Sequence, residues 1–251
     1  MGIHLCFIVA SVCLLSCNGA AQNCANVKLT PSDLVKKKTK YVLFLIADDR
    51  SGSTSNPGQP ARLNVDQYNA LVQEFLNRGY SGQFAVRIIG NTQNSGFETA
   101  LEFERGFKEI PVDEHKRLSE KAVIRCKNQL IRDTNQKILS RKNHAVRTFM
   151  SNVVQNRVLN YRPNGPDRTD IYTALRDIEL KMNIGASFDK IIVVIFSDGV
   201  DSNRRPLQLN SGQKPFDLVL IGWPPNRQLK QGEVRLGSAD DLVTWFQNLN
   251  L

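Results

Sequence analysis

The chain has 251 residues, a length that predicts one domain with a single hydrophobic core, or two smaller domains. Its 41% hydrophobic content, with 12 Phe, excludes wholesale disorder. No window after residue 21 approaches the roughly 18 apolar residues of a membrane span, which excludes a polytopic membrane protein. The net charge of +9 fits an acidic partner or surface, but it also fits simple solubility.

The N-terminus has the pattern of an export signal. Residues 1–21 contain no Lys, Arg, Asp or Glu, and 3–15 is an almost unbroken apolar run followed by small residues. This run is too short for a membrane helix and is typical of a secretory signal peptide. Two processing routes stay open. Cleavage after Ala21 would release the chain, whereas 14–17 (Leu-Leu-Ser-Cys) resembles a bacterial lipobox in which Cys17 is acylated. Both routes predict an extracytoplasmic protein, either secreted or attached to the cell envelope by an N-terminal lipid.

Two cysteines lie beyond this leader, Cys24 and Cys126, too few for a disulfide framework. They can pair in an oxidising compartment, and two free thiols are an equal alternative. Neither has histidines at metal-ligand spacing, which argues against zinc. Residues 22–39 are polar and are interpreted as a tether, followed by one domain over 40–251.

Apolar runs and helical patterns alternate along this domain. The runs predict buried strands at 41–47, 85–89, 191–196 and 216–222. Such unbroken runs are typical of strands covered on both faces, as in a parallel sheet between helices. Apolar residues at helical spacing predict helices at 65–78, 170–182 and 238–249. We therefore predict an α/β fold, with a doubly wound, mostly parallel sheet and helices on both faces.

Two segments depart from this alternation. Residues 97–103 alternate apolar with polar side chains, which predicts an antiparallel edge strand in a hairpin with 85–89. Residues 113–160 are basic, lack Gly and Pro, and carry apolar residues at heptad spacing. They predict a helical insertion, either one long helix or two successive helices, with an apolar stripe and a basic back.

Oxygen-bearing side chains follow two of the predicted strands directly. The segment 49–53 (Asp-Arg-Ser-Gly-Ser) comes after the first, and 197–199 (Ser-Asp-Gly) after the run at 191–196. Thr169 precedes a predicted helix. Binding sites in open α/β sheets form beyond the carboxyl ends of the strands, so we expect these groups to converge. Mg²⁺ prefers such oxygen ligands. The predicted metal site consists of Asp49, Ser51, Ser53, Thr169 and Asp198, with Mn²⁺ able to replace Mg²⁺.

These segments resemble the metal-ion-dependent adhesion site of von Willebrand factor type A domains. The family pattern Asp-x-Ser-x-Ser is matched by 49–53, its separate Thr by Thr169, and its Asp-Gly by 198–199. The matches occur in family order, and the resemblance covers the chain from about residue 40 to residue 249. Arg168 is a departure from the pattern, since it puts a cation beside Thr169, and we expect it to face solvent.

The resemblance implies a role for each residue. Ser51 and Ser53 would be direct metal ligands, Thr169 would bind directly or through water, and Asp49 and Asp198 would act mainly through waters. With few anions in direct contact, such a cation accepts a Glu or Asp carboxylate from another protein. The resemblance therefore implies a binding protein with an acidic protein ligand, and not an enzyme.

Other function classes have less support in the sequence. A phosphoacceptor receiver domain also carries paired acids such as Asp48 and Asp49, but no Asp follows the strand at 85–89 and no Lys follows 216–222. The 3 His do not cluster, and no Gly-x-Ser-x-Gly motif supports a catalytic triad. The alternative function is an envelope scaffold whose basic insertion binds acidic protein or lipid surfaces, with a purely structural metal. No nucleic-acid partner is expected of an exported protein.

Overall fold

A computed structural model of the protein describes residues 24–51, 62–90, 96–162, 168–184, 188–210 and 214–249. The predicted leader with Cys17, and the predicted ligand Ser53, lie outside these residues. The chain divides into two compact units. The first contains the described residues up to Val35 together with Lys108–Asp133, and the second contains Lys36–Phe107 and the chain from Thr134 onwards.

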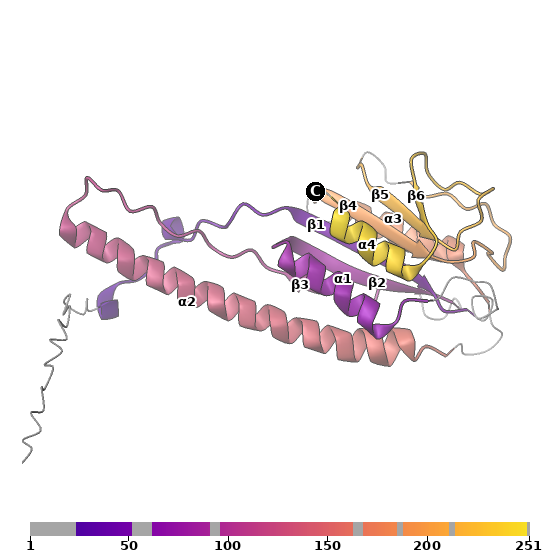
Figure 1. Ribbon diagram of the computed structural model, residues 1–251, viewed down its shortest axis with the longest axis horizontal. Coiled ribbons are helices and arrows are strands. Elements are labelled where there is room, and N and C mark those ends of the chain that lie inside the picture. Colours follow the sequence, from indigo (N-terminus) through magenta and orange to yellow (C-terminus); the bar gives the residue numbers. More distant parts are fainter. Residues whose placement is uncertain are drawn as a thin grey trace, which may run out of the picture. The chain divides into compact units, whose positions relative to one another are not determined.

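The second unit is an α/β domain built on a six-stranded sheet of order β3-β2-β1-β4-β5-β6 (Figure 1). The strands are β1 (Tyr41–Asp49), β2 (Ser81–Ile89), β3 (Leu101–Phe103), β4 (Lys190–Phe196), β5 (Asp217–Ile221) and β6 (Val234–Leu236). Neighbouring strands pair in parallel except β2 and β3, which are antiparallel. The predicted fold class, including the antiparallel edge strand, is confirmed. The short strand β6 was not predicted, because none of its residues is fully buried and its sequence has no apolar run.

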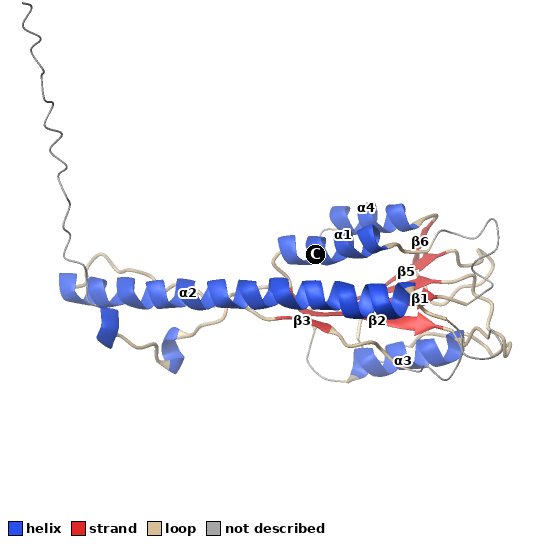
Figure 2. Ribbon diagram, turned by 90° about the horizontal axis from the view of Figure 1, so that it is seen from below, coloured by secondary structure: helices blue, strands red, loops and turns tan. Residues whose placement is uncertain are grey.

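Helices cover both faces of this sheet. They are α1 (Val65–Asn77), α3 (Ile171–Asn183) and α4 (Ala239–Asn248), and the long helix α2 (Leu118–Thr148) continues as the π-helix η5 (Phe149–Leu159). Figure 2 shows α1 and α4 on one face of the sheet and α3 on the other. The residues of η5 pack in the same core as α1 and α4. Ser238 caps α4 as predicted, since its Oγ accepts the Asp241 N–H at 3.2 Å.

Alternation along β1 divides its side chains between two cores. Val42, Phe44 and Ile46 lie in the core under α1, α4 and η5, whereas Leu43, Leu45 and Ala47 lie in the core under α3. Successive side chains of a strand point to opposite faces. The two acids that end the strand therefore separate: Asp48 continues the α1 side and Asp49 the α3 side.

The predicted helical insertion at 113–160 is one continuous helical run, which begins at Leu118. Residues 113–117 before it are not helical and contain a turn at 114–115. The two units divide the run between Asp133 and Thr134. Among the described residues, no helix has both the length and the apolar character needed to cross a bilayer.

The first unit joins the start of α2 to the segment before the domain. Its short helices are η1 (Cys24–Asn26) and η2 (Pro31–Asp33). Cys24 and Cys126 form a disulfide with a Cα–Cα distance of 5.5 Å, which decides between pairing and free thiols. The Asp33 carboxylate forms an ion pair with the Lys127 ammonium, with Oδ2 and Nζ 2.8 Å apart. Part of the predicted tether at 22–39 is therefore a folded element, cross-linked to α2.

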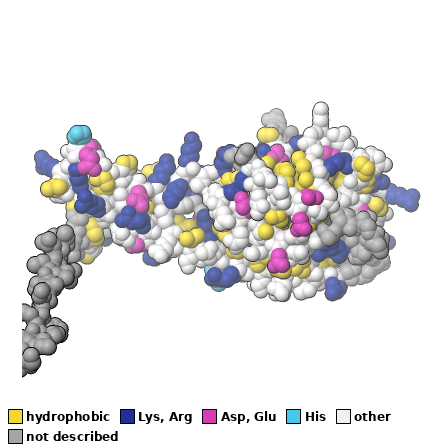
Figure 3. All heavy atoms as spheres, in the orientation of Figure 1, with side chains coloured by type: hydrophobic (Ala, Val, Ile, Leu, Met, Phe, Trp, Pro, Cys, Tyr) yellow, Lys and Arg dark blue, Asp and Glu magenta, His cyan; other side chains and the backbone are white. Residues whose placement is uncertain are grey.

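Charge is mixed on the face of the molecule that Figure 3 presents. There, Lys and Arg side chains of the second unit are interspersed with Asp and Glu.

Candidate metal site at the carboxyl edge of the sheet

The predicted site lies where the direction of strand order reverses. β1 and β4 are parallel neighbours, with β2 and β3 on one side and β5 and β6 on the other. In open α/β sheets, ligands bind outside the carboxyl ends of the strands at this switch point. Asp49 is the last residue of β1, and Asp198 follows the end of β4 by two residues. The sheet therefore brings both predicted carboxylates to this edge.

Asp49 is buried and connects the loops that follow β1 and β4. Its Oδ1 accepts the hydroxyl of Ser51 at 2.6 Å and the Ser51 N–H at 2.9 Å. Its Oδ2 accepts the hydroxyl of Ser197 at 2.7 Å. Ser197 lies on the α3 side of the sheet because it continues the alternation of β4. Ser197 is not among the predicted ligands, although it directly precedes Asp198 in the sequence.

The Asp49 carboxyl has a perturbed acidity. Its pKa is raised from 3.8 to about 6. Burial is the main cause, the hydrogen bonds from Ser51 and Ser197 act in the opposite direction, and the nearby charge of Asp198 adds to the effect of burial. Asp198 is itself buried, and its Oδ1 accepts the Val200 N–H at 2.9 Å. Two buried carboxyl groups thus lie near each other, and a cation here would favour the charged form of Asp49.

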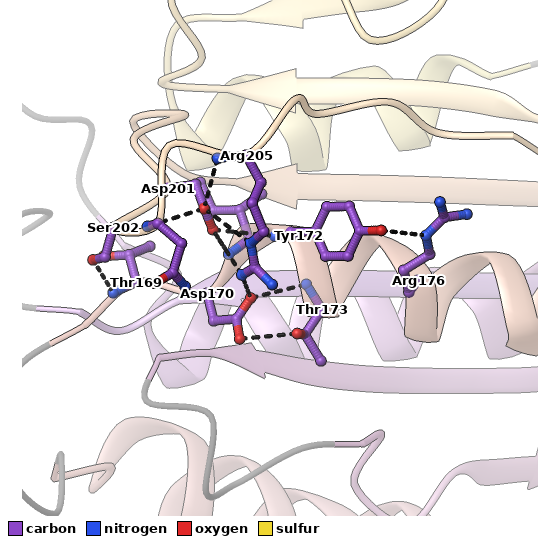
Figure 4. A network of polar contacts seen from close by, with 10 residues as sticks. Thr169, Asp170, Tyr172, Thr173, Arg176, Asp201, Ser202 and Arg205 are labelled. Carbon is purple, nitrogen blue, oxygen red and sulfur yellow. Dashed lines mark hydrogen bonds and ion pairs between the residues drawn. The ribbon is translucent and has the colours of Figure 1, made fainter.

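Thr169 is joined to the loop that carries Asp198. Its N–H donates to the Ser202 hydroxyl at 2.8 Å, and its carbonyl oxygen accepts the Ser202 N–H at 2.9 Å (Figure 4). The N–H of Asp170 donates to the carbonyl oxygen of Gly90, just beyond β2, at 3.2 Å. Thr169 is buried, whereas Arg168 is exposed, as expected.

Asp170 and Asp201 both cap the N-terminus of α3. Asp170 accepts the N–H of Thr173 at 2.9 Å, and Asp201 accepts the N–H of Ile171 at 3.0 Å. These bonds satisfy N–H groups that have no partner within the helix. Because Asp201 comes from the loop after β4, its bonds fix that loop to the start of α3. The local cap was detectable in the sequence, but the cap from Asp201 depends on tertiary structure.

Arg205 completes this network. Its guanidinium forms ion pairs with Asp170 and Asp201, and it lies over the ring of Tyr172 at 4.5 Å (Figure 4). One guanidinium thus serves two buried carboxylates. The contacts hold the loop after β4 beside Thr169. Asp49 takes no part in them and has other donors, Ser51 and Ser197.

The other acid of the pair, Asp48, belongs to a separate cluster on the α1 side. Its Oδ2 accepts the Tyr68 hydroxyl at 2.6 Å and the Arg50 guanidinium at 2.6 Å. Arg50 also donates to the carbonyl oxygen of Leu63 at 2.8 Å. Burial and the Asp48 charge raise the pKa of Tyr68 well above its ordinary value. Asp48 thus has a cationic partner of its own and takes no part in the predicted site.

The described members of the site match the oxygen chemistry of a hard cation. Asp49, Ser51, Thr169 and Asp198 come from three segments. Asp49 is bonded to Ser51 and lies near Asp198, and Thr169 is bonded to the loop that carries Asp198. Within the described parts of the chain, no three His, Cys, Asp or Glu side chains form a metal-binding group. A cation here would therefore depend on hydroxyl oxygens and water besides the two carboxylates, which Mg²⁺ accepts.

No protein-family model matches the chain, and no curated protein matches it. Membership of the type A family is therefore a proposal, and its support is the residues and the sheet described above.

Proposed function

We propose that this protein is an extracytoplasmic von Willebrand factor type A domain that binds an acidic protein ligand through Mg²⁺ or Mn²⁺. The observation that supports the proposal is the position of Asp49, bonded to Ser51 and close to Asp198, at the switch point between β1 and β4. Thr169 is bonded to Ser202 in the loop after β4. The sheet, with its antiparallel edge strand, is consistent with the resemblance. The proposed activity is binding and not catalysis.

Each residue has a defined task in this proposal. Ser51 and Thr169 would hold the cation through hydroxyl oxygens, and Ser53 would add a third hydroxyl. Asp49 orients the Ser51 hydroxyl through the bond at 2.6 Å and, with Asp198, supplies negative charge mainly through waters. When bound, the cation supplies an open position for a carboxylate oxygen of the partner protein.

Two features support a place outside the cytoplasm. The leader at 1–21 has the pattern of an export signal. The disulfide between Cys24 and Cys126 is of a kind that persists in oxidising compartments. We propose that the mature chain begins either at an acylated Cys17 or after Ala21, and mass spectrometry of its N-terminal peptide separates the two routes.

The two tryptophans allow a direct test of the metal site. The indole Cε2 of Trp223 lies 3.3 Å from where a Cβ on Gly199 would be, next to Asp198. Trp245 lies late in α4, and the end of α4 meets Arg78 at the opposite edge of the sheet. Paramagnetic Mn²⁺ broadens NMR signals steeply with proximity. We expect it to broaden the Trp223 indole N–H signal at concentrations that leave Trp245 sharp.

EDTA should restore the Trp223 signal, and the Ser51→Ala variant should need much more Mn²⁺ for the same broadening. Arg147→Ala, an exposed position on α2, is the control and should behave as the unchanged protein. Equal broadening of both indole signals, or broadening unaffected by Ser51→Ala, would contradict the proposal.

A further inference from the structure

A cavity of about 670 Å³ lies beside the candidate metal site in the second unit. Its walls are the loop after β4, including Val200 and Arg204, and the loop after β5, including Trp223 and Arg227. Ligand pockets are commonly about 300–1,000 Å³. The space therefore suits a peptide side chain with its neighbours better than a single ion.

The lining is rich in positive charge. Arg204, Arg205 and Arg227 contribute to it, against the single acid Asp201. Arg205 is already paired with Asp170 and Asp201. Within the described residues, neither Arg204 nor Arg227 forms an ion pair, although Arg227 donates to the carbonyl oxygen of Gly199 at 2.5 Å. Two guanidinium groups thus remain to attract an anion.

Arg204 is held in an uncommon conformation. Its φ of +53° is the one positive value among the non-glycine residues that the structure describes. Left-handed backbone is unfavourable for a residue with a long side chain and tends to occur at functional sites. The Arg204 side chain is exposed, so burial does not explain the conformation. Arg204 ends a turn in which its N–H donates to the Asp201 carbonyl oxygen at 3.0 Å, and its side chain lines the cavity.

Trp223 adds a donor that has no acceptor. The residue is 7% exposed, and its indole Nε1 is buried without a hydrogen-bond partner in the described structure. Arg204 and Arg227 offer donors only, so the ligand that they suit is one with acceptor oxygens.

We propose that this cavity is a second acidic subsite, which takes a Glu or Asp side chain of the partner protein next to the one held at the metal. The short segment from Asp198 to Asp201 connects the two places, so neighbouring acids of one peptide can reach both. The proposal rests on the proposed function in naming an acidic peptide. The guanidinium groups of the cavity favour an anionic ligand whether or not a metal is bound.

The probe is a blocked tri-glutamate peptide, added to the full chain with and without Mg²⁺, and the readout is the pair of indole N–H signals. We expect a saturable shift of Trp223 with Trp245 unchanged, and tighter binding when Mg²⁺ is present. Arg204→Gly, which suits the left-handed backbone, should weaken binding about fivefold or more, and Arg227→Ala should act in the same direction. Arg147→Ala removes the same charge from an exposed helix and should have little effect.

The outcomes separate the two proposals. A Trp223 shift without Mn²⁺ broadening would support the subsite and contradict the metal function. Mn²⁺ broadening without a peptide-induced shift would overturn the subsite and leave the metal function intact. Equal weakening by Arg204→Gly and Arg147→Ala, or tighter binding of inorganic phosphate than of tri-glutamate at equal ionic strength, would also overturn it. The unchanged Trp245 signal verifies that each variant is folded.

Discussion

The two faces of the sheet treat the paired acids at the end of β1 in opposite ways. Asp48, on the α1 side, is bound by the guanidinium of Arg50 and the hydroxyl of Tyr68. Asp49, on the α3 side, accepts neutral donors, the hydroxyls of Ser51 and Ser197. One residue step along the strand thus gives the two carboxylates different hydrogen-bond partners, and we propose that only Asp49 belongs to the metal site. Identical side chains acquire different surroundings from the alternation of the strand.

The largest effect, on the free energy of unfolding, is expected for the Asp48 cluster on the α1 side. Arg50→Met would leave the fully buried Asp48 without its cationic partner. Removing one member of a buried ion pair typically costs about 3–5 kcal/mol, because an uncompensated charge stays inside. Urea unfolding should show a loss of this size. A loss below about 1 kcal/mol, as for exposed ion pairs, would show that Arg50 does not compensate a buried charge on Asp48.

For Asp49, on the α3 side, the expected effect is on metal affinity. Asp49→Asn keeps the size of the side chain and removes its charge, so we expect Mn²⁺ affinity to fall by about 10- to 100-fold, as for other residues that support metal ligands. Calorimetric titration measures the change. Unfolding of the metal-free variant should shift far less than for Arg50→Met, since the lost carboxylate is poorly hydrated. The opposite order of effects would reverse the roles assigned to the two faces.

The Tyr68 hydroxyl sharpens the same comparison. Tyr68→Phe removes one hydrogen bond to the Asp48 carboxylate while Arg50 stays in place. A hydrogen bond to a charged group contributes about 1.5–3 kcal/mol, and the expected destabilisation lies at the lower end because the Arg50 pairing persists. Mn²⁺ binding should be unchanged, and a drop in metal affinity would indicate that the two faces are coupled.

A carboxylate near the surface of the first unit gives the smallest effect. Hydrogen bonds from Lys127 and Thr30 lower the pKa of Asp33 from 3.8 to about 2. The folded protein therefore binds fewer protons than the unfolded chain between these values, and the contribution to stability is full above about pH 4 and lost as the pH falls toward 2. Lys127→Met should reduce this dependence and cost less than about 1 kcal/mol at neutral pH. Unfolding followed at pH 3 and pH 7 tests it.

The elements with regular apolar patterns were predictable with small errors. The run at 41–47 became β1, two residues longer, and the helices predicted at 65–78 and 170–182 have ends within a residue of those observed. Strand β2 starts earlier than its predicted core, because Ser81 and Gly82 carry no apolar signal. The edge strand β3 is shorter than the predicted strand at 97–103. Outside β3, this segment pairs with β2 only through an isolated bridge between Phe97 and Arg87.

By itself, the sequence determined which segments are buried strands, that they alternate with helices, and that Asp49, Ser51, Thr169 and Asp198 follow or precede them at a sheet edge. These conclusions depend on side-chain periodicity and neighbouring residues, which are local properties. Tertiary structure alone decided three further points. They are the pairing of Cys24 with Cys126, the cap that Asp201 places on α3, and the cavity around Trp223. Each joins segments far apart in the chain, and their meeting depends on strand order and helix packing, which no local pattern encodes.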